Sequence, residues 1–335
     1  MEKKKENKIF IISLVVALGL SLLIRLADPL LDRFTHLPDQ GPTWYYWKLP
    51  QPENLARITA WLGYGLQQLF TWLFVRAVMK SLQEKRKASL RLSLLGLLGS
   101  LFFIVLHFMQ THLFYDGLAQ DVPIFTSQDS VIGMLIVILI MAIPARGLFF
   151  GKKIPVKQRV IEFIRNYHGY FITWALVYTF WFHPMDGDWI LVIGFFYMFL
   201  LFIQVGLAAT SLHFNLAWIT VLEAFVAVHA TVVAVLSGQA IWPMFLFGFL
   251  GVLIITQIYG LKLPIVVRLG VSALYLIGAG VVYYFRGYEK IYEITFIPLI
   301  LYAGALLLII MIQFGQWLVD WMAGIRKEIK KKPLS

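Results

Sequence analysis

Ionisable side chains within long apolar segments are the residues of this sequence best placed to do chemistry. His107, His183 and His229 lie in or at the end of such segments, and Glu223 lies in the same segment as His229. Ionisable groups at membrane depth are costly and usually functional. Histidine titrates near neutral pH and can act as a general acid or base. The candidate catalytic or proton-carrying residues are therefore His229, His107, Glu223 and His183.

Four other polar residues are candidates for substrate binding. Arg25 carries a guanidinium, whose paired donors suit a phosphate or a carboxylate. Asp186 lies at the rim of an apolar segment, and the amides of Gln67 and Gln204 lie inside two others. Together these groups could line a polar path through the bundle.

The depth of these residues in a bilayer follows from the helical rise of about 1.5 Å per residue. His107 then lies roughly 12 Å, and His229 about 10 Å, below the outer membrane edge, with Arg25 at a similar level. Glu223 lies nearer the midplane, and Gln67 matches its depth. One hypothesis is a shared polar cavity in the outer half of the bilayer. The alternative is that the histidines only form hydrogen bonds between helices.

The spacing of the histidines does not predict a cofactor. In the segment holding His168 and His183 the two side chains diverge by about 60°, and those of His213 and His229 diverge by about 160°. Two stacked haems do not fit this arrangement. A single haem between His183 or His107 and His229 stays open, as does a metal ion held by the histidines and Asp186. No ligand pair at one-turn spacing supports the metal, and the cofactor is left unknown.

Signature motifs of soluble enzymes are missing from the sequence. There is no Walker A loop, no G-x-G-x-x-G and no G-x-S-x-G motif, so an ATP site in this chain is not expected. The net charge of +11 raises nucleic-acid binding as a possibility, which the distribution of the charges excludes below. The absence of cysteine excludes disulfide and thiolate chemistry.

Composition identifies the elements that must position these residues. Of the 335 residues, 60% are hydrophobic and only 14% are charged, against about half and a quarter in a soluble domain. At roughly 20 apolar residues per crossing, the chain has room for about ten transmembrane helices. We predict an all-α polytopic bundle forming a single domain, with helices near 9–31, 54–80, 91–115, 131–150, 166–183, 189–210, 213–236, 240–259, 265–285 and 292–322.

The basic residues give the orientation of this bundle. If the N-terminus is cytoplasmic, most of the 29 lysines and arginines fall in inner loops, as the positive-inside rule requires. The excess of positive charge is then topological, and nucleic-acid binding drops out. We predict a multi-pass plasma-membrane protein with both termini in the cytoplasm. The outer side keeps only Arg25, Arg33, Lys48, Arg57, Arg286 and Lys290.

The stretch 32–53 is the longest predicted outer loop. It contains four prolines and the aromatic run Trp44, Tyr45, Tyr46 and Trp47. Aromatic residues gather at membrane interfaces, so the segment is predicted to be an outer interfacial loop, with a lid over the bundle as the alternative.

The sequence leaves three functional hypotheses open, of which the first two are favoured. The first is a membrane-embedded enzyme with an outward-facing site, acting as a transferase or hydrolase on a lipid or cell-envelope substrate. The second is a proton-coupled secondary transporter that uses Glu223 and His229. The third is an assembly or partner subunit. The partners expected are membrane lipids, with a protein partner conceivable through the basic cytoplasmic loops.

Overall fold

The fold is an all-helical bundle of the membrane type. The computed structural model describes residues 1–335 except 1, 39–46, 52, 85–89, 116 and 332–335. The predicted aromatic run at 44–46 lies outside the described residues. The described part contains no β-strand, only an isolated bridge between Phe149 and Lys152. Its α-helices are α1 (Glu2–Ala27), α2 (Asn54–Gln83), α3 (Leu90–Phe114), α4 (Ile124–Arg146), α5 (Gln158–Phe182), α6 (Trp189–Gly206), α7 (Leu216–Leu236), α8 (Trp242–Ile255), α9 (Ile265–Arg286) and α10 (Phe296–Lys331).

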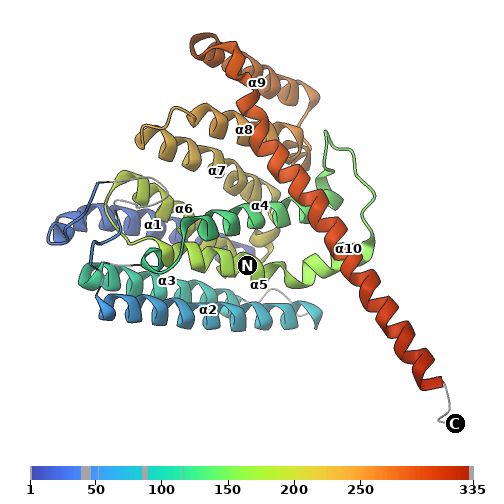
Figure 1. The fold of residues 1–335 in the computed structure, drawn as a ribbon, viewed down its shortest axis with the longest axis horizontal. Coiled ribbons are helices and arrows are strands. Elements are labelled where there is room, and N and C mark those ends of the chain that lie inside the picture. Colours follow the sequence, from blue (N-terminus) through green and yellow to red (C-terminus); the bar gives the residue numbers. More distant parts are fainter. Residues whose placement is uncertain (1, 39–46, 52, 85–89, 116, 332–335) are drawn as a thin grey trace.

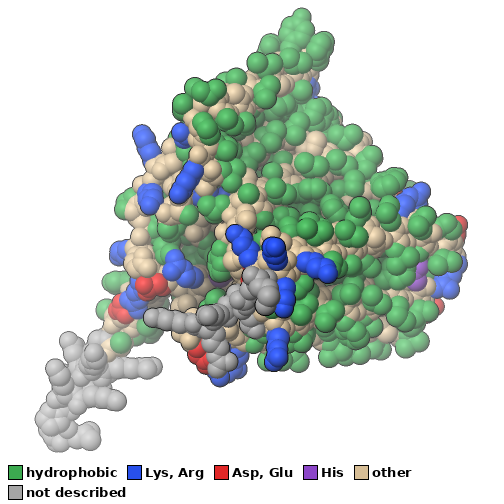
Figure 2. Space-filling view, turned by 180° about the vertical axis from the view of Figure 1, so that it is seen from behind, with side chains coloured by type: hydrophobic (Ala, Val, Ile, Leu, Met, Phe, Trp, Pro, Cys, Tyr) green, Lys and Arg blue, Asp and Glu red, His purple; other side chains and the backbone are tan. Residues whose placement is uncertain are grey.

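Seven of the described helices are long and apolar enough to cross a membrane: α1, α3, α4, α6, α7, α9 and α10. The 14-residue α8 is too short for this criterion. At about 1.5 Å per residue it spans roughly 21 Å, less than the hydrocarbon core. The composition of the sequence and the apolar helices of the structure therefore both indicate an α-helical membrane protein. Figure 2 shows a surface dominated by hydrophobic side chains, with most of the visible lysines and arginines at the left and centre and a smaller group at the right edge.

Several predicted segments differ from the observed helices. Those predicted at 9–31 and 166–183 begin earlier, at Glu2 and Gln158. The segment predicted at 131–150 is helical over Ile124–Arg146, because Gly147 takes φ 76° and ends α4. The segment predicted at 240–259 breaks after Ile255 and continues as the 3₁₀ helix η5 (Gln257–Leu261). The segment predicted at 292–322 becomes the 3₁₀ helix η6 (Tyr288–Thr295) followed by the longer α10.

The buried side chains form two main cores. We call the first the aromatic core, because Phe180, Trp181, Phe195 and Phe199 dominate it. It joins α1, α2, α3, α6 and the second half of α5, and α7 contributes Leu222. The second, the aliphatic core, joins α4, α8, α10 and the first half of α5. In Figure 1, α2 and α3 lie at one edge of the molecule, α9 lies at the opposite edge, and α10 runs diagonally across the bundle.

The two ends of the bundle differ in charge. We call the end where α5 begins the basic end, because Lys152, Lys153, Lys157 and Arg159 precede or open that helix. Two contacts place both ends of the chain here. Near the N-terminus, Glu6 accepts a 2.7 Å hydrogen bond from Ser211, which lies between α6 and α7. Near the C-terminus, Asp320 of α10 pairs with Arg159. The opposite end, where α5 runs into α6, holds His183, Asp186 and Asp188 and is called the acidic end.

Candidate functional site

A buried ion pair joins α4 to α7 near the basic end. The guanidinium of Arg146 donates two parallel hydrogen bonds to the carboxylate of Glu223, at 2.6 Å to Oε2 and 2.8 Å to Oε1. The two side chains are only 5% and 7% exposed. Charges are almost never buried to this extent unless they are paired. Such a bidentate geometry is the strong form of the arginine–carboxylate interaction.

The local structure explains how Arg146 reaches Glu223. Arg146 is in the last turn of α4, where a cation interacts favourably with the helix dipole. Gly260 of η5 lies against its side chain: a Cβ at that position would be 3.0 Å from Cδ of Arg146. The glycine therefore provides the space through which the guanidinium crosses to α7.

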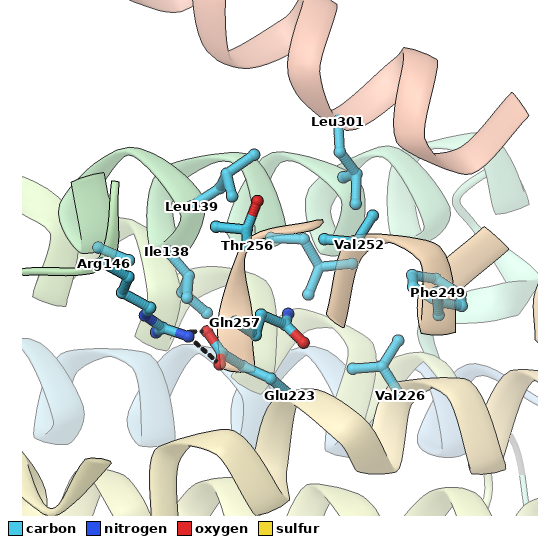
Figure 3. Close-up of a pocket in the computed structure, with 12 residues that line it drawn as sticks. Ile138, Leu139, Arg146, Glu223, Val226, Phe249, Val252, Thr256, Gln257 and Leu301 are labelled. Atoms are coloured by element: carbon cyan, nitrogen blue, oxygen red, sulfur yellow. Dashed lines mark hydrogen bonds and ion pairs between the residues drawn. The ribbon is translucent and has the colours of Figure 1, made fainter. Parts of the chain in front are cut away.

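A small cavity adjoins the pair. Its volume is about 20 Å³, which is room for roughly one water molecule. Apart from Arg146 and Glu223 its walls are mostly apolar, and they come from α4, α7, α8 and α10 (Figure 3). The residues that form these apolar walls are Leu135, Ile138, Leu139, Ala142, Val226, Phe249, Val252 and Leu301.

Gln257 brings an unsatisfied polar atom to this cavity. It lies directly after the break in α8, and its buried Oε1 has no hydrogen-bond partner among the described residues. In Figure 3 its amide lies beside the carboxylate of Glu223 and faces the space below Val252. Buried polar atoms are nearly always hydrogen-bonded, so this oxygen marks a place for a water molecule or a ligand.

The connection between α4 and α5 is hydrogen-bonded to the end of α8, next to the cavity. The backbone N–H of Phe150 donates to the carbonyl of Ile255 at 2.8 Å. Thr256 donates to the carbonyl of Leu148 at 2.5 Å and pairs with the hydroxyl of Tyr302 at 2.8 Å. Phe150 itself has φ 50°, a conformation that costs a non-glycine residue about 1–3 kcal/mol. The broken end of α8 is thus fastened to both α4 and α10.

His107 and His229 do not share a cavity wall. The Nε2–H of His107 donates to the carbonyl of His183 at 2.9 Å, and its ring packs on Trp181 and Phe195. His229 instead lies against Gly194 and Tyr197 of α6. Residues 194 and 197 are on a different face of α6 from Phe195, since successive residues turn by about 100°. The two rings therefore occupy separate helix interfaces, as the alternative to a shared cavity expects.

The predicted residues at the acidic end hold chain segments together. His183 donates from Nδ1 to the carbonyl of Thr179 at 2.9 Å. Asp186 accepts hydrogen bonds from Tyr115 Oη at 2.8 Å and from the backbone N–H of Asp188 at 2.9 Å. Arg25 pairs with Asp28 at 2.6 Å. All these groups have partners in the protein itself.

Two glutamines predicted to bind substrate are likewise engaged. Gln67 accepts a 2.7 Å hydrogen bond from the indole of Trp181 and is fully buried. Gln204 donates to the carbonyl of His213 at 3.0 Å and accepts from the indole of Trp218 at 2.8 Å. The first braces α2 against α5, and the second fixes the turn from α6 to α7. Of the predicted site residues, the ion-pair site contains only Glu223.

Asp186 is predicted to make stability depend on pH. Burial raises the pKa of its carboxyl and the nearby Asp28 raises it further, against the hydrogen bonds from Asp188 and Tyr115. A carboxyl whose pKa is higher in the folded than in the unfolded state stabilises the fold when protonated. We therefore expect this contribution to decrease as pH rises above about 3.9, the usual value for aspartate. Unfolding by sodium dodecyl sulfate in mixed micelles at several pH values would measure it. Asp186→Asn should flatten the profile, and an unchanged profile would contradict the assignment.

Comparisons with known proteins do not assign the site. No protein-family model, curated protein or solved structure matches the chain. Within the described residues, no group of three or more His, Cys, Asp or Glu side chains could hold a metal ion. The geometry of the ion-pair site is therefore the basis for the functional argument.

Arg146 is the site residue that sequence reasoning missed. It is one of the basic residues on the predicted inner side of the membrane, and it falls inside the segment predicted at 131–150. The available signal was one arginine and one glutamate inside two predicted spans. Glu223 was instead matched by depth to Gln67, and this comparison ignored the length of the arginine side chain, which can extend its charge well along a helix axis.

Proposed function

We propose that this chain is a proton-coupled secondary transporter in which Glu223 carries the proton. The observation that supports this most is the buried Arg146–Glu223 pair beside a cavity that four helices line. Ionisable residues inside a membrane bundle typically pair with one another and mark ion pathways and proton relays. The pair is also the type of contact that one proton can break.

The position of the pair fits a moving part of the molecule. Arg146 belongs to α4 and hence to the aliphatic core, whereas α7 contributes Leu222, the neighbour of Glu223, to the aromatic core. The ion pair therefore lies on the seam between the two cores. In many secondary transporters one helical unit rocks against another around a central site lined by a broken helix. The break after α8 likewise lines the ion-pair site through Gln257, although it lies nearer the basic end of the bundle.

Protonation of Glu223 gives the coupling. Ionised Glu223 neutralises Arg146 and holds the seam closed. Neutral Glu223 leaves the guanidinium without a counter-charge, a state that is strongly unfavourable in a buried site. The seam then opens to water, which hydrates Arg146. In this account the pair is both the gate and the proton site.

The enzyme hypothesis loses support from the contacts at the acidic end. Its candidate bases, His229 and His107, lie in separate helix interfaces, and Nε2 of His107 is hydrogen-bonded to the carbonyl of His183. Its proposed anion-binding group, Arg25, is paired with Asp28. The transporter hypothesis keeps Glu223 and gives His229 no necessary role. We place the protein in the plasma membrane with the basic end, and with it both termini, in the cytoplasm, following the positive-inside rule.

Cysteine labelling tests this proposal without knowledge of the substrate. The chain contains no cysteine, so single cysteines at Leu139 and Val226 would report access to the cavity with no background. We expect a membrane-impermeant methanethiosulfonate reagent to label both positions from either side of oriented vesicles. A pH gradient should change the ratio of labelling from the two sides, and Glu223→Gln should abolish that change.

Control positions make the labelling interpretable. Ala175→Cys, fully buried on α5, should stay unlabelled, and Ala323→Cys on an exposed part of α10 should label from one side only. Labelling of Leu139→Cys from one side at every pH would indicate a cavity with one opening and contradict transport. Labelling from neither side would indicate a solid bundle, with the same consequence.

A further inference from the structure

We infer that the transported solute is a small monocarboxylate, and that it binds Arg146 in place of Glu223. This inference rests on the proposed function and assigns its substrate class. The guanidinium of Arg146 already binds a carboxylate through two parallel hydrogen bonds at 2.6 and 2.8 Å. The arrangement of donors that fits the Glu223 side chain also fits the carboxylate of a solute.

Charge balance in the buried site sets the stoichiometry. In the observed state the cavity contains one cation, Arg146, and one anion, Glu223. When Glu223 takes a proton from water, the site gains one positive charge. A single monoanion on Arg146 restores neutrality, whereas a cation or a second proton would add to the imbalance. One proton therefore enters with one monoanion, so that their co-transport moves no net charge.

The walls of the cavity define the rest of the solute. Beside the ion pair, the lining includes Leu139, Val226 and Val252, which would face an apolar body. The unpartnered Oε1 of Gln257 can accept one hydrogen bond and has no donor among the described residues. A carboxylate with a short apolar body and a hydroxyl donor matches these features. The 20 Å³ cavity holds about one water, so the solute enters only when the seam has opened.

Proton uptake on binding tests this inference in detergent-solubilised protein. Lactate and propionate are the probes, since lactate adds one hydroxyl to propionate, and chloride and tetramethylammonium are the controls. In weakly buffered solution with a pH indicator, lactate should cause uptake of one proton per molecule bound. Its affinity should rise up to tenfold for each unit that pH falls, which is the limit for linkage to one proton. Lactate should bind more tightly than propionate, and Gln257→Leu should remove that difference.

Variants of the pair give opposite results under this scheme. Glu223→Gln leaves Arg146 without a competing carboxylate, so lactate should bind more tightly, without proton uptake and independently of pH. Arg146→Gln should lose lactate binding. The double variant Arg146→Gln/Glu223→Gln, whose site contains no charge, should also fail to bind lactate. The matched control is Arg159→Gln, which removes the guanidinium of the exposed Arg159–Asp320 pair and should leave lactate binding unchanged.

Each contrary result has a defined meaning. Failure of both carboxylates to bind at acidic and alkaline pH would overturn the inference, as would binding that persists in the double variant or takes up no proton. These results would leave the proposed transport intact if a pH gradient still changes the side from which the cavity cysteines are labelled. Conversely, proton-linked lactate binding with cysteines accessible from one side only would uphold the anion site and reject transport.

Discussion

Glu223→Leu should lower the free energy of unfolding by about 3–5 kcal/mol, because it leaves the Arg146 guanidinium buried without a partner. Both side chains of the pair are more than nine-tenths buried, so water cannot replace the lost carboxylate at low cost. Unfolding by sodium dodecyl sulfate in mixed micelles, followed by tryptophan fluorescence, would measure the loss. A change below about 0.5 kcal/mol, the range of surface substitutions, would show that the pair is hydrated and contradict the buried geometry.

The double variant Arg146→Met/Glu223→Leu should recover most of that loss. Replacement of both members of a buried ion pair by apolar residues of similar volume is often neutral or stabilising. The variant would then be folded but unable to carry a proton, which separates the structural role of the site from its function. Asp320→Leu in the exposed Arg159–Asp320 pair is the control, and its effect should be within about 1 kcal/mol. Equal losses of unfolding free energy from Glu223→Leu and Asp320→Leu would contradict this account.

Trp181→Ala should lower the free energy of unfolding by about 3–5 kcal/mol, through the cavity it would leave in the aromatic core. Trp181 is fully buried, and its ring contacts His107 with a 4.3 Å separation of ring centroids. The substitution would also leave Oε1 of Gln67 without its donor. The same unfolding experiment would measure the effect.

Trp317 provides a matched control for this substitution. It lies on α10 with its side chain 57% exposed, and Trp317→Ala should change stability by less than about 0.5 kcal/mol. Comparable effects of the two tryptophans would mean that α5 is not central to the aromatic core. Trp181→Phe should retain more stability than Trp181→Ala, since it preserves much of the buried volume.

Much of the helical architecture could be predicted because apolar length and turn residues record it directly. The segments predicted at 213–236 and 265–285 correspond closely to α7 and α9, since both are continuous apolar runs bounded by polar or glycine residues. The break in α8 at Thr256 was not predictable. It depends on the hydrogen bonds of Thr256 to Leu148 and Tyr302, which are distant in the sequence.

The candidate site could be predicted only in part for a related reason. Glu223 stands out in the sequence as a carboxylate within an apolar run, but its partner depends on which helices are neighbours. Depth alone matched it to Gln67, whose actual partner is Trp181. The histidines attracted attention by residue type, and the structure places His107 and His229 on different faces of α6. Which helices pack against one another determines both the partner of Glu223 and the separation of His107 from His229, and a single sequence does not reveal that packing.

The most direct test of the account is the distance between the two cores at different pH. Spin labels on Ala77→Cys of α2 and Trp317→Cys of α10 would measure it by double electron–electron resonance in lipid nanodiscs, again without background cysteine. The account predicts two distance populations, with the more open one favoured at acidic pH, and a distribution in Glu223→Gln that no longer responds to pH. A single distance at every pH, or the same pH response in Glu223→Gln, would contradict control of the seam by protonation of Glu223.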